Sequence, residues 1–292
     1  MMDMIVDIAH AEWDAPASDA NQAAAIDALE NGRVVHLPRL AFTVTETEKR
    51  FLDPKILSKA KNVSYTPWTG KVGGTVLEGA EAEALRAMLE RFSKSAHALM
   101  KNLFPHYQGS LRSGRASLRP AEIAGRKSSW RKDDTRLHVD AFPTMPTHGE
   151  RIIRVFTNVN PHGRPRVWRV GEPFENVAQR FAPGIARPLP GSAWFMHLVK
   201  LTKKRRSEYD HYMLHLHDAM KSDMDYQRSV GEKPVEFRPG TTWITFTDQV
   251  SHAALAGQHQ FEQTFNLPLT GMLHPERSPL KVLERVTGRA LI

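Results

Sequence analysis

LHVDAF, at residues 137–142, is the segment around which the rest of the chain is organised. It places a His-x-Asp step after a charged run and before a proline-containing turn. Side chains alternate between two faces of an extended segment, so His138 and Asp140 are expected to point the same way. The segment therefore predicts a strand that supplies an imidazole and a carboxylate to one metal ion.

The third ligand must come from far along the sequence, and His252 is the best candidate. It follows a strand expected at 241–247, as a ligand on a neighbouring strand would. Two imidazoles and one carboxylate on one face of Fe(II) leave positions open for cosubstrate and dioxygen. His259 is the rival third ligand. The alternative is that His138 and His252 are ordinary, partly buried imidazoles.

A second histidine group lies on an expected helix. His211 and His215 have the i, i+4 spacing of helical zinc sites, and His217 is close by. The residues between His211 and His215 include no glutamate, which a helical His-Glu-x-x-His site would need. These histidines are interpreted as residues of a helix surface.

Composition excludes several classes of site. The 292 residues include no cysteine, which excludes disulfides, thiolate zinc sites and cysteine nucleophiles. A net charge of +8 favours an anionic partner such as nucleic acid, an acidic lipid surface or an acidic small molecule. The alternative is a merely basic surface. The first residues do not resemble a secretory signal, and no run of eighteen apolar residues occurs, so we expect a soluble, cytoplasmic protein.

Short strands with turn signals between them dominate the expected elements. Strands are predicted at 33–37, 111–120, 137–142, 151–159, 166–170, 241–247 and 261–268. Helices are predicted at 21–30, 81–103, 192–227 (basic in part) and, as a short helix or a tail, 280–292; residues 62–74 are expected to be a loop. Helices gathered near the N-terminus, without regular strand–helix alternation, favour an antiparallel jelly roll over a parallel sheet.

The predicted fold class is mainly β with flanking helices (α+β), built on a double-stranded β-helix of the jelly-roll or cupin type. We expect one domain over residues 1–292. Its predicted parts are an N-terminal helical and strand elaboration at 1–110, a jelly-roll core at 111–270 with a helical insertion at about 192–230, and a C-terminal tail at 271–292.

Several stretches resemble the 3-deoxy-D-manno-octulosonic acid (Kdo) hydroxylase family. The stretches are 119–143, which contains SWRKDDTRLHVDAFP, then 154–161, 167–172, 209–227 and 247–268, so the resemblance spans most of the chain. That family belongs to the Fe(II)/2-oxoglutarate dioxygenases and hydroxylates carbon 3 of Kdo in the inner core of lipopolysaccharide, giving Ko. The resemblance implies Fe(II), with 2-oxoglutarate and O2 as cosubstrates. The implied catalytic and metal-binding residues are His138, Asp140 and His252.

The sequence departs from the wider superfamily after the distal histidine, where a basic residue commonly pairs with the far carboxylate of 2-oxoglutarate. Residues 261–266 contain no basic residue, and Glu262 would repel that carboxylate if it pointed inward. The resemblance therefore implies a cation from another strand, with a structural ion pair to a buried acid as the alternative. The expected cosubstrate contacts are Arg154 first, then Arg166 and Arg151, with hydrogen bonds from Gln263 and Thr264.

The implied substrate is a Kdo-containing lipopolysaccharide precursor, which is anionic. Candidate contacts are Arg131, Lys132 and Arg136 for the Kdo carboxylate and Trp130 for stacking on the sugar, with packing in the core as the alternative for tryptophan. The basic run at 200–206 is expected to make peripheral contact with the anionic cytoplasmic face of the inner membrane, or else to be a solvated helix end. Neither nucleic acid nor an obligate protein partner is expected.

Two other functions stay open from sequence alone. One is a jelly-roll oxygenase that acts on a protein or another small molecule. The other is a non-catalytic module that binds acidic glycans or nucleic acid through its basic face.

Overall fold

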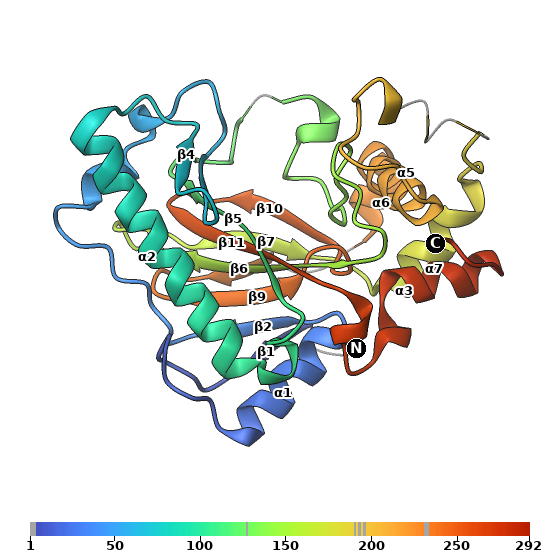
Figure 1. The fold of residues 1–292 in the computed structure, drawn as a ribbon, viewed down its shortest axis with the longest axis horizontal. Helices are drawn as coiled ribbons and strands as arrows, with labels where there is room; N and C mark the ends of the chain where they lie inside the picture. The colour runs from blue at the N-terminus through green and yellow to red at the C-terminus, as the bar shows by residue number, and fades with distance from the viewer. Residues whose placement is uncertain (1–3, 127, 190, 192–193, 195–196, 231–233) are drawn as a thin grey trace.

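Two β-sheets lie at the centre of the computed structural model, which describes residues 4–292 except 127, 190, 192–193, 195–196 and 231–233 (Figure 1). The larger sheet has the strand order β1-β2-β9-β6-β11-β5-β3-β4, and the smaller has the order β10-β7-β8. The larger sheet consists of β1 (Ile5–Asp7), β2 (Val34–Leu37), β9 (Thr242–Phe246), β6 (Arg151–Asn158), β11 (Gln260–Leu267), β5 (Arg112–Arg119), β3 (Val63–Thr66) and β4 (Lys71–Gly73). The smaller consists of β10 (His252–Ala256), β7 (Arg166–Val170) and β8 (Pro234–Phe237).

Strand pairing is antiparallel throughout both sheets except between β1 and β2. Aromatic side chains of the two sheets pack against one another. Phe237 of β8 stacks on Trp243 of β9 with ring centroids 4.1 Å apart, and Trp168 of β7 meets Phe156 of β6 at 5.0 Å. The predicted class, mainly β with flanking helices, is confirmed.

Six described α-helices surround the sheets: α1 (Asp19–Glu30), α2 (Gly79–Leu103), α3 (Phe174–Phe181), α5 (Glu208–Ser222), α6 (Met224–Ser229) and α7 (Pro279–Thr287). Helix α2 runs across one face of the larger sheet (Figure 1). Its buried residues recur every three or four positions, and Phe92 contacts Phe261 of β11 with ring centroids 4.9 Å apart. The opposite face of this sheet is left for the smaller sheet and the site.

Helix α5 is fixed at its N-terminus by a capping box. The Ser207 side chain accepts from the backbone N–H of Asp210, and the Asp210 carboxylate accepts from the backbone N–H of Ser207. The same carboxylate accepts from the backbone N–H groups of Thr147 and His148. The helix is thereby attached to the turn that follows LHVDAF, and this attachment positions its side chains beside that segment.

Several predicted elements are wrong. Residues 62–74 form the hairpin of β3 and β4 rather than a loop, because Val63 and Tyr65 alternate into the core. The segment 137–142 is no strand: its described ladder contact is the single bridge between His138 and His252. The basic run 200–206 lies in a turn, bends and coil before α5, and part of the helix expected at 192–227 lies outside the described residues. Strand β10 and helix α3 were not predicted.

Candidate metal centre

His138, Asp140 and His252 lie together at one end of the smaller sheet. Each offers one ligand atom, and the three atoms lie within 4.8 Å of one another. The bridge explains this proximity: the backbone N–H of His138 donates to the His252 carbonyl at 3.0 Å, and the reverse bond measures 2.9 Å. Asp140 is held by its own backbone N–H, which donates to the Thr247 carbonyl at 2.7 Å.

Backbone carbonyls decide the tautomers of the two imidazoles. Nδ1 of His138 lies 2.7 Å from the Arg136 carbonyl oxygen, and Nδ1 of His252 lies 2.8 Å from that of Val250. A carbonyl oxygen only accepts, so each Nδ1 carries the proton and each Nε2 presents a lone pair. Burial lowers the pKa of both imidazoles, which keeps them neutral.

The carboxylate of Asp140 stays ionised despite its burial. Burial raises its pKa, but the neighbouring Arg154 charge acts against that effect, and the pKa lies below its usual range. Two neutral imidazole nitrogens and one carboxylate oxygen are suitable ligands for a divalent transition metal. Backbone carbonyls that orient the imidazoles are the partners that such ligands normally have. The three residues therefore fit a metal.

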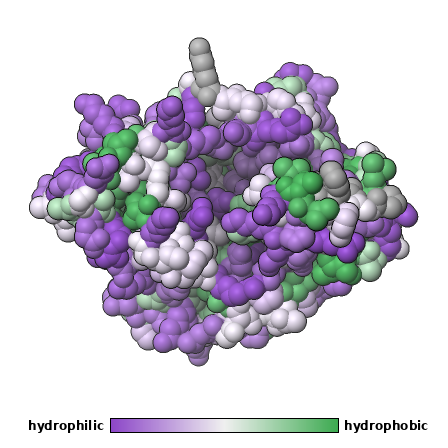
Figure 2. Space-filling view, turned by 45° about the horizontal axis from the view of Figure 1, so that its top comes forward, coloured by the Kyte–Doolittle hydropathy of each residue, from purple (hydrophilic) through white to green (hydrophobic). Residues whose placement is uncertain are grey.

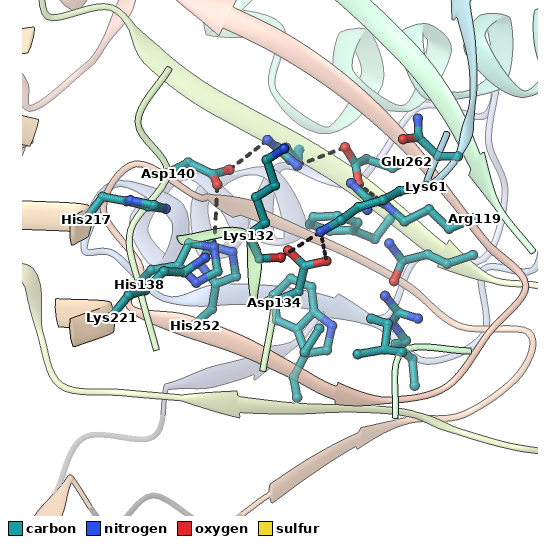
Figure 3. A pocket seen from close by; sticks show the side chains of 18 of the residues that line it. Lys61, Arg119, Lys132, Asp134, His138, Asp140, His217, Lys221, His252 and Glu262 are labelled. Atoms are coloured by element: carbon teal, nitrogen blue, oxygen red, sulfur yellow. Dashed lines mark hydrogen bonds and ion pairs between the residues drawn. The ribbon is translucent and has the colours of Figure 1, made fainter. Parts of the chain in front are cut away.

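The triad opens into a cavity of about 500 Å³, here called the triad cavity. Its lining includes seven lysine or arginine side chains and three acidic ones. Figure 2 shows the molecule hollowed, with hydrophilic residues around the opening, and Figure 3 shows charged side chains from several elements converging on the triad. The charged lining residues are Lys61, Arg119, Arg131, Lys132, Arg154, Arg166, Lys221, Asp134, Asp140 and Glu262. This excess of positive charge suits anionic ligands.

A buried ion-pair network forms one wall of the cavity. Nη1 of Arg154 lies 2.8 Å from Oε1 of Glu262, and Nε of Arg119 lies 3.0 Å from the other oxygen of that carboxylate. Burial raises the pKa of Glu262, but the two guanidinium charges outweigh this and lower it. Glu262 does point inward, and its charge is balanced by the two arginines on the neighbouring strands.

A family model described as 3-deoxy-D-manno-oct-2-ulosonic acid (Kdo) hydroxylase matches residues 12–290. The chain belongs to this family. Three solved structures of the Kdo hydroxylase KdoO, a non-haem Fe(II) alpha-ketoglutarate-dependent dioxygenase, agree with that assignment. The complex with alpha-ketoglutarate and Fe(III) is 44% identical with a TM-score of 0.95, and the cobalt(II) complex and the apo structure are each 45% identical with a TM-score of 0.96. Each match covers 99% of this chain and 97% of that chain.

These matches confirm the predicted family and the two-sheet fold. A comparison with curated proteins gave no significant match. No described helix combines the length and apolar character that a membrane crossing requires.

Two buried cations of this family member have no carboxylate partner within 4.0 Å among the residues that the structure describes. Arg166 is 2% exposed, and its Nη1 donates to the Gly257 carbonyl at 2.6 Å. Lys221 is also 2% exposed, and its Nζ donates to the Arg131 carbonyl at 3.1 Å. Buried cations of this kind normally have an anionic partner. Both are therefore available to a bound anion.

The structure places two of the four predicted substrate contacts at the triad cavity and two away from it. Arg131 and Lys132 line the triad cavity, whereas Arg136 and Trp130 are not among its lining residues. Nε of Arg136 pairs with Asp133 at 3.2 Å, and the Trp130 ring lies 4.1 Å from the Arg131 guanidinium carbon. Arg136 and Trp130 are thus engaged with neighbours in the chain, Asp133 and Arg131.

Of the predicted cosubstrate contacts, some lie at the triad cavity and others lie away from it. Arg154 and Arg166 line the triad cavity, but Gln263 and Thr264 are not among its lining residues. Gln263 alternates to the face of β11 opposite Glu262, where its amide donates to the Gly114 carbonyl at 3.0 Å. Arg151 pairs with Asp248 outside the cavity lining, at 2.7 Å.

Among the other histidines, His217 has a place in the cavity. Its ring centroid lies 5.4 Å from that of His138, whereas His211, His215 and His259 are not lining residues. Sequence reasoning also missed Lys61, Arg119 and Lys221. For Lys221 a signal was available in the sequence: it is spaced i, i+4 from His217 on an amphipathic helix, so the two side chains lie on the same face.

Proposed function

We propose that this chain is an Fe(II)- and 2-oxoglutarate-dependent dioxygenase that hydroxylates carbon 3 of Kdo, giving Ko, in the inner core of lipopolysaccharide. The observation that carries the proposal is the triad of His138, Asp140 and His252 at the cavity of a chain that is 44–45% identical to KdoO over nearly its whole length. Fe(II) bound there supplies the oxidising chemistry. One O2 and one 2-oxoglutarate are consumed, and succinate, carbon dioxide and the hydroxylated sugar are formed.

The residues of the chain prepare the site for that chemistry. His138, Asp140 and His252 would hold the iron through two Nε2 atoms and one carboxylate oxygen. Trp168 stacks on the His252 ring, with centroids 5.1 Å apart and planes 21° from parallel, and so excludes water from one side of this ligand. Arg154 pairs with Oδ2 of Asp140 at 2.9 Å, whereas Oδ1 is the oxygen 3.8 Å from Nε2 of His138. These contacts orient the ligands before a metal arrives.

For the far carboxylate of 2-oxoglutarate, the contacts favour Arg166 over Arg154. Both terminal nitrogens of Arg154 already pair with carboxylates, those of Asp140 and Glu262. Arg166 keeps donors for an external carboxylate, and its planar guanidinium can bind one through two parallel hydrogen bonds. Val170, the β7 partner of His252, is four residues from Arg166, so the two positions are about 13 Å apart along the strand at about 3.3 Å per residue. A long side chain and a five-carbon dicarboxylate can span that distance.

The proposed partner is a Kdo-containing lipopolysaccharide precursor presented at the cytoplasmic face of the inner membrane. The basic run 200–206 is followed by α5, which lines the triad cavity. The run contains the exposed Leu201, at 62% exposure, and is preceded by the exposed Leu198, at 58%. Cations beside exposed apolar side chains suit a peripheral contact with anionic lipid. Neither nucleic acid nor an obligate protein partner enters this proposal.

The deciding experiment is the anaerobic addition of Fe(II) and 2-oxoglutarate to the purified protein. We expect a weak visible charge-transfer band from the chelate, lost in His138→Ala and retained in the control His215→Ala. Mass spectrometry of lipopolysaccharide from cells that express the chain is expected to show one added oxygen on a Kdo unit. A folded wild-type protein without the band, or lipopolysaccharide without the added oxygen, would contradict the proposal.

A further inference from the structure

Lys221 is a buried ammonium group that the proposed iron and cosubstrate contacts do not use. It lies in the last turn of α5, lines the triad cavity, and donates one hydrogen bond to a backbone carbonyl, that of Arg131. An ammonium group has three donors, so two remain. Burial lowers its pKa, and the charges of Asp134 and Asp140, neither of which pairs with it within 4.0 Å, offset this only in part. A ligand that supplied an anion would remove this cost.

The position of Lys221 relative to the triad is the second observation. One helical turn earlier on α5, His217 packs against His138 with ring centroids 5.4 Å apart. Figure 3 shows Lys221 and His217 on the side of the cavity where His138 lies. Lys221 therefore reaches the cavity next to the metal ligands, whereas Lys132, exposed to solvent, lies at its mouth.

The chemistry of the proposed substrate requires a cation in that position. Carbon 3 of Kdo is bonded to carbon 2, which carries the carboxylate carbon 1. The carboxylate carbon is thus about 2.5 Å from carbon 3, because each carbon–carbon bond is about 1.5 Å. When carbon 3 faces the metal, the carboxylate must lie within a few ångströms of the triad. The cation that binds it must line the inner part of the cavity.

The other cations of the cavity wall are already used or lie elsewhere. Arg119 and Arg154 pair with Glu262, and Lys61 lies 3.4 Å from Asp134. Arg131 pairs with Asp218 at 2.9 Å. Arg166, the other buried cation without a carboxylate partner among the described residues, is assigned above to 2-oxoglutarate. Two buried cations therefore match two anionic ligands.

We propose that Lys221 binds the carbon-1 carboxylate of the Kdo unit and so turns carbon 3 toward the triad. This inference rests on the proposed function, since it takes the Kdo ring as the substrate. It makes Lys221 a determinant of substrate specificity: a sugar of the same shape without the acid would lose its main anchor.

Equilibrium binding tests the inference without any turnover. The probes are a methyl glycoside of Kdo and the same glycoside with its carboxyl group converted to a carboxamide, titrated by calorimetry into protein loaded with cobalt(II) and 2-oxoglutarate. We expect the wild type to bind the acid at least tenfold more tightly than the amide. Lys221→Met is expected to bind both equally weakly, because it keeps the length of the side chain and removes the charge.

Lys132→Met is the matched control, since it removes one charge from the mouth of the same cavity. It is expected to keep the preference for the acid. Lys221→Arg keeps the charge and is expected to restore part of the preference, which a merely structural role for Lys221 would not predict. A Lys221→Met protein that still prefers the acid tenfold overturns the inference. Wild-type protein that binds neither probe and adds no oxygen to lipopolysaccharide would instead contradict the proposed function.

Discussion

Nη2 of Arg154 lies 2.9 Å from Oδ2 of Asp140. Oδ1 of the same carboxylate lies 3.8 Å from Nε2 of His138 and faces the ligand nitrogens. One oxygen is thus held by a guanidinium while the other is directed at the metal position. Arg154 therefore contacts one of the three residues that fit a metal.

Arg154→Met is therefore expected to weaken metal binding. Asp140 would lose the cation that fixes its rotamer and favours its ionised form, and loss of such an outer contact typically costs 10–100-fold in metal affinity. Titration with cobalt(II), followed by its visible absorption, measures this. Arg119→Met is the control, because it removes the other partner of Glu262 without touching Asp140. Equal cobalt affinity in Arg154→Met and the wild type would refute the role.

Arg166→Met is expected to weaken 2-oxoglutarate binding and leave metal binding unchanged. A hydrogen bond to a charged group contributes about 1.5–3 kcal/mol, which corresponds to roughly 10–150-fold in the dissociation constant. Anaerobic titration of the Fe(II) protein with 2-oxoglutarate, followed by the chelate band, measures it. The 2-oxoglutarate affinity of Arg166→Lys is expected to lie between those of the wild type and Arg166→Met, because lysine keeps the charge but lacks the planar guanidinium. If Arg166→Met binds 2-oxoglutarate normally, the far carboxylate is bound elsewhere.

The sequence predicted the site where local geometry and one long-range pairing were sufficient. Two-residue alternation put His138 and Asp140 on one side, and the strand expected at 241–247 led to His252. The structure brings these residues together, although through one bridge between short segments rather than between two long strands.

The remainder of the cavity depends on packing that the sequence does not encode locally. Glu262 points inward because the register of β11 places it opposite Phe156 of β6, a pairing over about one hundred residues. Lys221 lines the cavity only because the capping box and the Thr147 turn fix α5 beside the triad. The hydrophobic periodicity of β11 does not show that Glu262 points inward, and that of α5 does not show that Lys221 lines the cavity.

His259 makes the folded chain sensitive to acid. Burial, and then the nearby His162, lower its pKa to about 4, from about 6.5 in an unfolded chain. Between these values the unfolded state binds the proton and the folded state does not. Stability is therefore full above about pH 6.5, falls as the pH decreases toward about 4, and loses nothing further from this group below that.

His259→Asn is expected to flatten this part of the stability profile, since asparagine does not titrate. Asparagine also tolerates the left-handed backbone at this position, where φ is +61°. Urea unfolding of both proteins at pH 7, 5.5 and 4.5 gives the comparison. The difference between wild type and variant isolates His259 from the other buried histidines. Parallel profiles for the two proteins would show that His259 does not contribute.

Arg151 and Asp248 form a buried ion pair that supports the segment carrying His252. The two residues are 0% and 1% exposed, and Nε of Arg151 lies 2.7 Å from Oδ2 of Asp248. Nη2 of Arg151 also donates to Gln249 at 2.6 Å, and the guanidinium carbon lies 3.7 Å from the centre of the Phe246 ring. One guanidinium thus contacts three residues of the segment 246–249 that leads to the distal histidine.

Arg151→Met is expected to destabilise the protein by about 3–5 kcal/mol, because it leaves the Asp248 carboxylate buried without its cation. The double variant Arg151→Met with Asp248→Leu is expected to recover much of this loss, since it removes the unpaired charge as well. The free energy of unfolding in urea measures both. Wild-type stability in the single variant, or a double variant less stable than the single, would show that the ion pair is not what holds this segment.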